Sequence, residues 1–551
     1  MFINQKFVKG LLIAAFFYFP ALVNAQGLTL SASQLNFGVA YENAPDSLTL
    51  TISNPTAAAI NVTGFRFYNI YGEPAFSAAD NYLTVPAGGS ATTWIRFSPR
   101  HNIFHNTEMV VVNDGLRGYL SVDLQGQGRY SNTYYNATEN LSEEALKQSI
   151  HTITGNNYLS LGYTIGRDTM FMITDNKKVN GQGASVNTIE CIYTGREAIG
   201  YTDRTDCQTN DNFNTEHTFP QSLFSSQEPM RSDLHHLFPT DNDANNERAD
   251  NLFGVVSSPT WSVGGSKSNG TIFEPRDVQK GRTARAMLYF VLRYQNYSNY
   301  VTLSEETTLR NWHNTFLPDA VEEKRNSDIM RAQHNRNPFV DYPQFTDRIH
   351  SFISTSVAPT DFNADLTQDT IIFGYVTANT SADFNYVMVN YGNVAIDISN
   401  IQITHPSELS FTYGDTATTL QPGESHNFGI HFFSPLTDSV RAFFSFDYVS
   451  NGGGTINHAY IPVFVNDVVH NSISENDKPA LLVYPNPANE VLIVEFPGSN
   501  FHGAIELYSM IGQKVLTQEI DNVKVELNVR GLSPGIYFLK AGASAKSIEI
   551  R

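Results

Sequence analysis

Positively charged residues are scarce in this 551-residue chain. Lys and Arg together number 35, Asp and Glu number 54, and the formal net charge at pH 7 is −19. This balance excludes a protein that coats nucleic acid through overall positive charge, because such binding requires a basic surface. It does not exclude an enzyme acting on nucleic acid, since catalysis needs only a local positive strip and a metal ion.

Long apolar runs are also scarce. The most apolar one, residues 11–23, is too short to span a bilayer comfortably, and no later segment is apolar enough, so no transmembrane segment is predicted. Lys6 and Lys9 lie within the residues before this run, and the sequence Val-Asn-Ala ends at Ala25, which is typical of a signal peptide covering residues 1–25. Gln26 follows in place of a cysteine, so a lipoprotein anchor is not expected.

Cysteine is nearly absent. The chain has only Cys191 and Cys207. In an exported protein an isolated pair this close predicts a disulfide, and the alternative is two buried free thiols. The spacing is not CxxC, so metal binding by this pair is not expected.

Both ends of the chain favour β-structure, because short runs rich in Val, Thr and aromatic residues dominate them. Two of these regions resemble each other at a constant offset of 336 residues. The matching landmarks are Phe37-Gly38 with Phe373-Gly374, Pro86 with Pro422, and Ser98-Pro99 with Ser434-Pro435. Alternating apolar residues at this turn spacing predict two β-sandwiches, at residues 26–128 and 357–466. Both resemble Ig-like modules, which implies binding of an unidentified ligand.

The C-terminal segment carries ordered landmarks after a polar linker, residues 467–478. They are YPNPA at 484–488, LYSMIGQ at 507–513 and GLSPGIY at 531–537. Residues 479–551 thereby resemble the C-terminal sorting domain of type IX secretion substrates. The resemblance implies a small all-β sandwich read by the type IX machinery, and a protein that is secreted or attached to the cell surface. The alternative is a third small β-sandwich with a structural role.

The chemistry-bearing residues lie in the middle of the chain. Residues 214–222 read NTEHTFPQS, residues 233–241 read DLHHLFPTD, and residues 245–248 read NNER. Imidazole can take a proton from water near neutral pH, and carboxylate and amide oxygens suit Mg²⁺. These groups together favour hydrolysis of a phosphodiester with one hard metal ion.

These blocks, with EP at 274–275, GRTARAM at 281–287 and NRNPFVD at 335–341, resemble the endonuclease I family of secreted, non-specific nucleases. The resemblance covers roughly residues 135–355 and implies a catalytic domain at 129–356 with a ββα-metal (His-Me) finger. The predicted fold class is multidomain, with an α+β nuclease core between two Ig-like β-sandwiches and a small C-terminal all-β sandwich. The implied activity is hydrolysis of DNA, and also RNA, to 5′-phosphate products with Mg²⁺, for which Mn²⁺ can substitute.

Carried onto this sequence, the resemblance implies a catalytic set. His217 is the general base, Glu216 and Asn245 are the metal ligands, and Arg248 contacts a phosphate oxygen. Adjacent side chains of a regular strand point to opposite faces. Glu216 and His217 can therefore serve one phosphate only if the strand ends or distorts there.

Other residues near the motif have competing interpretations. Asp241 and Asp243 are rival metal ligands on spacing alone. Asp233, His235 and His236 suggest zinc, but no HExxH motif or third ligand at sensible spacing supports it, so a structural or supporting role is favoured. Arg231 is a weaker candidate for a phosphate contact, since the resemblance implies such an arginine in a longer loop than the one found here. The candidates for lining a nucleic-acid groove, and equally for a structural role, are Arg282, Arg285 and Arg336.

A rival function comes from another class of protein. The chain could be a surface adhesin or scaffold whose nuclease-like domain has lost activity. The presence of the full catalytic set argues against this rival.

Overall fold

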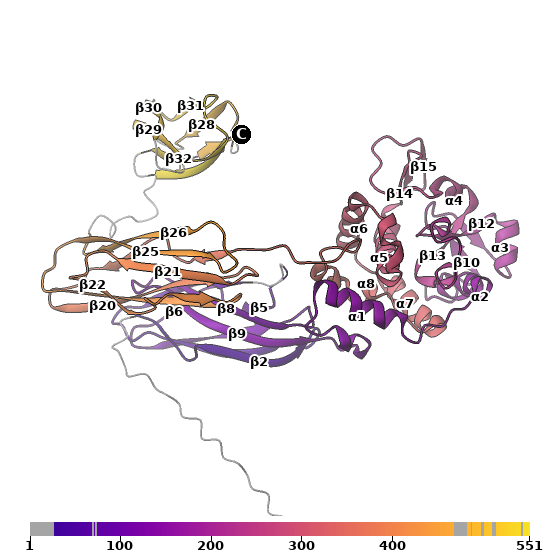
Figure 1. Ribbon diagram of the computed structural model, residues 1–551, viewed down its shortest axis with the longest axis horizontal. Coiled ribbons are helices and arrows are strands. Elements are labelled where there is room, and N and C mark those ends of the chain that lie inside the picture. The colour runs from indigo at the N-terminus through magenta and orange to yellow at the C-terminus, as the bar shows by residue number, and fades with distance from the viewer. Residues whose placement is uncertain are drawn as a thin grey trace, which may run out of the picture. The chain divides into compact units, whose positions relative to one another are not determined.

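The computed structural model describes residues 27–68, 71, 74–467, 482–485, 488–496, 501–509, 514–541 and 544–550. The predicted signal peptide, nearly all of the predicted linker and parts of two sorting landmarks lie outside the described residues. The chain divides into two compact units, Met1–Thr437 with Arg441–Phe464, and Asp438–Val440 with Val465–Arg551 (Figure 1). Within the described residues, no helix is long and apolar enough to cross a membrane.

The N-terminal region is a pair of sheets over one core. Its strands are β1 (Thr29–Leu30), β2 (Gln34–Tyr41), β3 (Asp46–Ser53), β4 (Ile60–Phe67), β5 (Phe76–Ala78), β6 (Leu83–Val85), β7 (Ser90–Phe97), β8 (Phe104–Asn113) and β9 (Leu120–Arg129). One sheet has the order β1-β3-β7-β5 and the other β2-β9-β8-β4-β6. Leu50 and Phe97 from the first sheet share a core with Val111 and Leu124 from the second.

A second pair of sheets follows residues 129–356, the predicted nuclease region. Its strands are β18 (Ala364–Leu366), β19 (Ile371–Gly374), β20 (Thr380–Asn390), β21 (Ile396–Ile403), β22 (Leu409–Tyr413), β23 (Thr418–Leu420), β24 (Ser425–Ser434), β25 (Val440–Ser450) and β26 (Asn457–Val465). The sheet orders, β18-β20-β24-β22 and β19-β26-β25-β21-β23, repeat the N-terminal orders strand for strand. This confirms the predicted internal repeat, while the Ig-like assignment stays a prediction.

The region between the two pairs of sheets is mixed. Its α-helices are α1 (Glu143–Gly155), α2 (Tyr163–Thr169), α3 (Arg204–Asn210), α4 (Asn242–Arg248), α5 (Asp277–Arg293), α6 (Leu303–Thr315), α7 (Ala320–Gln333) and α8 (Pro338–Asp341). Its strands are β10 (Thr188–Glu190), β11 (Glu197–Ile199), β12 (Phe213–His217), β13 (Leu237–Asp241), β14 (Leu252–Phe253), β15 (Trp261–Val263), β16 (Ser266–Ser268) and β17 (Ile272–Glu274). Its short 3₁₀ turns are η1 (Thr133–Thr138), η3 (Gln221–Phe224), η4 (Met230–Ser232), η5 (Leu234–His236), η6 (Gln295–Tyr300) and η7 (Pro343–Arg348), and η2 (Met170–Thr174) is a π-turn.

Helix α5 is the centre of this region. Every residue from Thr283 to Arg293 is buried, and Figure 1 shows α5 between α6 and the β12–β13 hairpin. Residues 286–292 of this helix are apolar on every face, so this part must lie inside the domain, and Ala284, Leu288 and Leu292 belong to the common core. The helix thereby holds the hairpin from behind.

The two ends of the nuclease region are joined to each other and to the first pair of sheets. His350 Nδ1 lies 2.6 Å from Glu143 Oε1. The buried guanidinium of Arg348 donates to Leu141 O at 2.9 Å and to Asn102 Oδ1 at 2.7 Å. The region therefore starts and ends at the same place.

The two pairs of sheets also contact each other. Arg66 pairs with Asp365 at 3.1 Å, and Asn385 Nδ2 donates to Tyr119 O at 2.7 Å. Val110 from the first pair is buried in one cluster with Val387 and Val389 from the second. The repeats therefore form one continuous unit with the nuclease region between them in sequence.

The C-terminal unit is all β. Its strands are β27 (Leu482–Tyr484), β28 (Val491–Glu495), β29 (Phe501–Ser509), β30 (Lys514–Asn522), β31 (Lys524–Asn528), β32 (Gly535–Ala541) and β33 (Ser544–Ile550). They form sheets β27-β28-β31 and β30-β29-β32-β33 around Leu492, Leu507, Leu527 and Leu539.

Candidate active site

The predicted catalytic motif forms a strand–strand–helix unit. Strand β12 pairs antiparallel with β13, from Phe213 opposite Asp241 to His217 opposite Leu237. Helix α4 follows β13 directly, and Asp241 Oδ1 accepts from Ala244 N at 2.8 Å as its cap. Asp241 also accepts from Thr194 Oγ1 at 2.6 Å, so it holds the hairpin to the helix. Of the two rival metal ligands, Asp241 is therefore engaged in capping, and Asp243 is exposed.

His217 is the last residue of β12, so the strand ends where the prediction required. The side chain is 5% exposed, and its Nε2 lies 3.1 Å from Arg231 O. A carbonyl oxygen can only accept, so Nε2 carries the proton and Nδ1 is left as the acceptor. Burial, followed by the neighbouring His236, lowers the pKa of His217 to about 3. The imidazole is therefore neutral at pH 7, with Nδ1 as its acceptor.

Glu216 lies beside His217 and is 3% exposed. Its Oε1 accepts from Tyr193 OH at 2.8 Å and lies 3.3 Å from Arg248 Nε. Burial raises the pKa of Glu216, and Arg248 and Tyr193 act in the opposite direction. Among the contacts of the described residues, Oε2 has no partner, so one carboxylate oxygen is available to a cation.

Asn245 and Arg248 lie three residues apart on α4 but differ in environment. The Asn245 side chain is half-buried and makes no hydrogen bond to any described residue. Arg248 is 2% exposed and donates to Thr218 O at 2.5 Å and to Ala249 O at 2.8 Å. The phosphate contact of Arg248 stays a prediction. In this structure its guanidinium contacts Glu216 and the end of the hairpin.

Asp233 is a buried structural residue. Its carboxylate accepts from Tyr289 OH, Tyr294 OH and Gln333 Nε2, each at 2.8 Å. It also lies 3.3 Å from Arg293 Nε. The carboxylate oxygens are thus engaged with protein groups.

The neighbouring histidines are also internal. His235 Nε2 lies 3.3 Å from Asn335 O, and His236 Nε2 lies 2.6 Å from Met230 O. Within the part of the chain that the structure describes, no group of three or more His, Cys, Asp or Glu side chains is placed to hold a metal ion. The zinc alternative therefore has no ligand set there.

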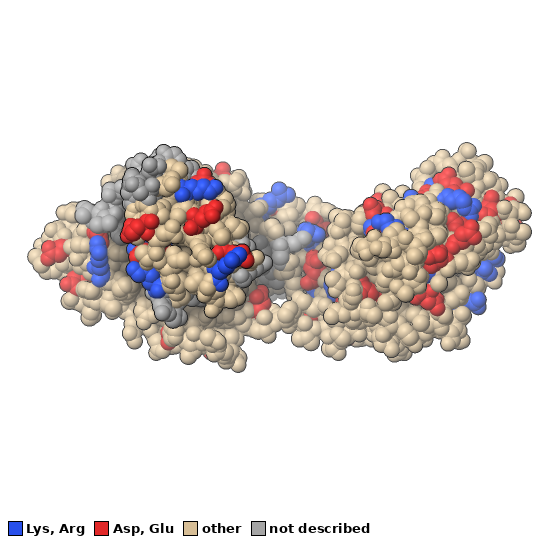
Figure 2. Space-filling view, turned by 90° about the horizontal axis from the view of Figure 1, so that it is seen from above, with Lys and Arg blue, Asp and Glu red and all other residues tan. Residues whose placement is uncertain are grey.

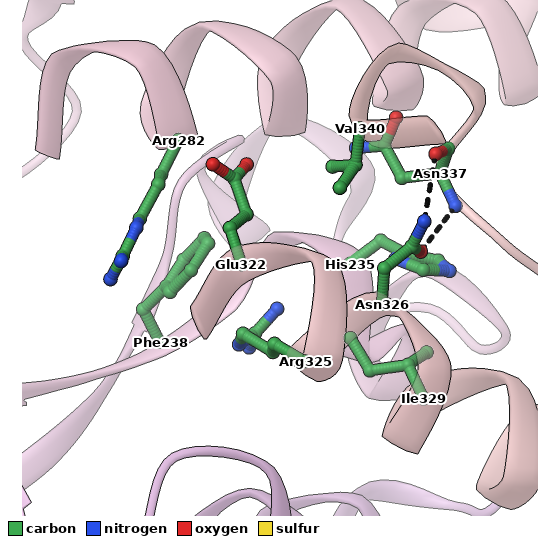
Figure 3. Close-up of a pocket in the computed structure, with 9 residues that line it drawn as sticks. All are labelled: His235, Phe238, Arg282, Glu322, Arg325, Asn326, Ile329, Asn337 and Val340. Carbon is green, nitrogen blue, oxygen red and sulfur yellow. Dashed lines mark hydrogen bonds between the residues drawn. The ribbon is translucent and has the colours of Figure 1, made fainter. Parts of the chain in front are cut away.

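Three of the four arginines predicted as candidate phosphate contacts are paired with carboxylates. Arg282 lies 2.8 Å from Asp319, and the other pairs are Arg285 with Glu322 and Arg336 with Asp341, each at 2.6 Å. Figure 3 shows Arg282 and Glu322 lining a small pocket that contains none of the predicted catalytic residues. These arginines hold helices together.

Arg231 is different. Its guanidinium carbon lies 4.0 Å from the centre of the Tyr163 ring, and the Arg167 guanidinium carbon lies 4.1 Å from the same centre. Tyr163 in turn stacks on His217, with ring centres 5.6 Å apart. Sequence reasoning missed Tyr163 and Arg167, because they lie on α2, far upstream of the motif. Their four-residue helical spacing is the one signal that relates them to each other.

The predicted disulfide is wrong. Cys191 and Cys207 are both free and buried. Cys191 Sγ accepts from Asp241 N at 3.2 Å, so it serves the hairpin as a hydrogen-bond acceptor. Cys207 lies on α3 within the core, where burial raises its pKa to about 12.

Surface charge agrees with a local site rather than a basic face. Among the described residues on the face shown in Figure 2, Lys and Arg side chains are interspersed with Asp and Glu and form no continuous basic strip. On this face, positive charge available to a ligand must therefore come from particular side chains.

Comparison with known proteins identifies the class. Residues 142–344 match the family model for Endonuclease I, and residues 482–551 match that for the secretion system C-terminal sorting domain. The chain therefore carries a domain similar to Endonuclease I and a C-terminal sorting domain, and these matches support a secreted or cell-surface nuclease. Both predicted resemblances are confirmed.

Individual relatives cover the nuclease region. The extracellular ribonuclease of Bacillus amyloliquefaciens is 28% identical over 234 residues, which is 39% of this chain and 78% of that protein. The extracellular ribonuclease of Bacillus subtilis (strain 168) is 26% identical over 236 residues, or 40% and 78%. The extracellular deoxyribonuclease of Aeromonas hydrophila is 26% identical over 117 residues, or 20% and 50%.

Proposed function

We propose that this protein is a metal-dependent endonuclease that hydrolyses DNA and RNA with little sequence preference. The observation that carries the proposal is the His217 ring. Its Nε2–H is held by Arg231 O, which leaves Nδ1 free to accept a proton, at the end of a strand beside Glu216. The strand–strand–helix arrangement supports a ββα-metal (His-Me) finger.

His217 Nδ1 takes a proton from water as the water oxygen attacks phosphorus. The bond from phosphorus to the 3′ oxygen breaks, and the departing oxygen takes a proton from solvent. The products are a 5′-phosphate and a 3′-hydroxyl. Because Nε2 is fixed on a backbone carbonyl, the ring keeps the tautomer and orientation that the step needs.

Glu216 and Asn245 fit a hard cation. Glu216 presents Oε2, and the Asn245 amide has no hydrogen-bond partner among the described residues. Mg²⁺ takes a small number of protein oxygens and keeps several waters, which suits a two-residue site. When bound, Mg²⁺ would supply positive charge to the phosphate and to the departing oxygen. Mn²⁺ would serve as a substitute.

Tyr193 and Arg248 position Glu216. Tyr193 donates to Oε1, and Arg248 lies against the same oxygen. Both favour the ionised form of a carboxylate that burial disfavours, and ionisation is what a cation requires. Arg248 therefore acts through Glu216 in this proposal.

Substrate range and export complete the proposal. The relatives include two ribonucleases and one deoxyribonuclease by name, which supports activity on both nucleic acids. The sorting domain directs the protein through the type IX machinery. The two repeated β-regions are Ig-like modules.

Plasmid nicking with Mg²⁺, with and without EDTA, tests this function. His217→Ala should remove most turnover, by about 10²–10⁴-fold, since that is what a positioned base contributes. His405→Ala, at an exposed histidine of the second β-region, is the matched control and should nick normally. Asn245→Ala should raise the Mg²⁺ requirement with little change in melting temperature. Full activity in excess EDTA would contradict the metal-dependent mechanism, and no activity in the intact protein would favour the adhesin or scaffold.

A further inference from the structure

A tyrosine and two arginines form a stack beside the predicted base. Tyr163 and Arg167 lie on α2, and Arg231 lies on η4. Both guanidinium carbons are within 4.1 Å of the Tyr163 ring centre. The Tyr163 ring is nearly parallel to the His217 ring, at 29°. The stack therefore places two cations next to the catalytic histidine.

Neither arginine of this stack forms an ion pair with a described residue. Among the described residues, no carboxylate pairs with Arg167 or Arg231, and neither guanidinium donates a hydrogen bond. The Nε atoms of both are buried without a partner. Asp168, next to Arg167 in the chain, is engaged by Arg204 at 2.6 Å. Two unpaired guanidiniums in a chain with net charge −19 indicate a site for an anion.

The backbone fixes the position of the stack. Gly166 lies between Tyr163 and Arg167 on α2, and a Cβ added there would lie 3.1 Å from Ser232 O. This close approach packs α2 directly against η4, the turn that carries Arg231. The two arginines are thus held in place before any ligand binds, which lowers the entropy lost on binding.

The chemistry of the stack selects a phosphate. A planar guanidinium binds phosphate oxygens through two parallel N–H donors, and it stacks on aromatic rings. Arg231 is linked to His217 through its backbone carbonyl, whereas Arg167 contacts the Tyr163 ring that stacks on His217. Arg231 is therefore the better candidate for the phosphate at His217, which leaves Arg167 for a neighbouring one.

We propose that Arg167, held on the Tyr163 ring, binds the phosphate next to the scissile one in the nucleic-acid strand. This inference rests on the proposed nuclease function and deepens it. Arg167 is then a substrate-binding residue, and it determines how the strand is placed on His217. Its removal should weaken binding of the strand while leaving the base and the metal ligands intact.

Steady-state kinetics of the full-length protein on a labelled single-stranded DNA oligonucleotide with Mg²⁺ test this assignment. Arg167→Gln should raise KM about tenfold, the value of one charge-assisted contact, with kcat within about twofold of wild type. The slope of log(1/KM) against log salt should become shallower by about 0.7, the contribution of one single-strand phosphate. Arg204→Gln is the control, because it removes the same charge nearby from an arginine already paired with Asp168.

The outcomes separate this inference from the proposed function. Arg167→Lys keeps the positive charge but loses the planar guanidinium with its two parallel donors. A KM between those of wild type and Arg167→Gln therefore supports a phosphate contact. If Arg167→Gln fails to fold, Arg167→Lys provides the test. An unchanged KM for both variants, a fall in kcat at unchanged KM, or an equal effect of Arg204→Gln overturns the inference. Wild-type protein that cuts no nucleic acid would contradict the proposed function as well. An active wild type with unaffected variants would contradict the inference about Arg167 alone.

Discussion

Replacing Asp233 by Asn tests whether this carboxylate is structural. The side chain is fully buried and lies 3.3 Å from Arg293 Nε. Asparagine has the same shape but no charge, so the variant leaves Arg293 buried without its counter-ion. We expect a large loss of stability without any change in the metal requirement.

The size of the loss can be estimated in two ways. Removing one partner of a buried ion pair costs about 3–5 kcal/mol. Burial alone would raise the pKa of Asp233, but Arg293, His235, His236 and the Gln333 hydrogen bond outweigh it and lower the pKa to about 2. Relative to its ordinary value of 3.8, that shift corresponds to roughly 2 kcal/mol. We therefore expect the free energy of unfolding to fall by about 2–5 kcal/mol at pH 7.

The same shift predicts a pH dependence. Because the folded-state pKa lies below the unfolded value, this stabilisation is fully present above about pH 4 and is lost as the pH falls towards 2. Asp233→Asn lacks this stabilisation. The difference in unfolding free energy between wild type and the variant should therefore shrink as the pH falls through that range.

Urea unfolding followed by tryptophan fluorescence is a suitable assay. Trp312 is buried in the nuclease region, whereas Trp94 in the first β-region is already half-exposed, so the signal reports mainly on the nuclease region. The control is Asp277→Asn, whose side chain is 75% exposed and should change stability by less than about 0.5 kcal/mol. A change in Asp233→Asn no larger than in this control, or the same difference from wild type at pH 7 and pH 2, would refute the reasoning.

The remaining predictions concern the site and the cysteines. Tyr193→Phe removes the hydroxyl that donates to Glu216, so the Mg²⁺ concentration for half-maximal nicking should rise about tenfold; an unchanged Mg²⁺ titration would contradict the positioning role. Because burial lowers the pKa of His217 to about 3, kcat/KM should lose little between pH 7.5 and 5.5, where an ordinary imidazole would lose about tenfold; an acid limb near pH 6.5 would count against this. Since Cys191 and Cys207 are free, the unreduced protein should expose two thiols to a colorimetric thiol reagent after denaturation, and none if the disulfide exists.

The repeated fold could be predicted because its landmarks have local causes. The Phe-Gly pair recurs since Gly38 and Gly374 both adopt positive φ, 65° and 69°, which glycine tolerates best. In the first copy the register of β2 against β9 shifts between Asn36 and Val39, around Gly38. A backbone requirement of this kind appears directly in the sequence. The order of the strands within each sheet does not, because it depends on long-range pairing.

The site could be predicted only where its parts are close in the chain. Glu216 and His217 are adjacent in one strand, so a short motif predicts that they lie together. The direction that Arg248 faces depends on how the short helix α4 packs, so the motif does not predict its contacts. Tyr163 and Arg167 were missed because packing across the domain, rather than sequence proximity, brings them to His217.

The adjacent ends of the nuclease region have a consequence for cooperativity. Contacts such as His350 with Glu143 bring the start and end of this region together while it is folded. If it unfolds, packing of the second β-region on the first must close a flexible loop of about 230 residues, which costs roughly 5 kcal/mol of chain entropy. A folded nuclease therefore raises the effective concentration of one repeat for the other. Conversely, two repeats that are packed together hold the ends of the nuclease region close to each other. This reduces the number of conformations open to the unfolded nuclease region, so the repeats and the nuclease region stabilise each other without an added contact.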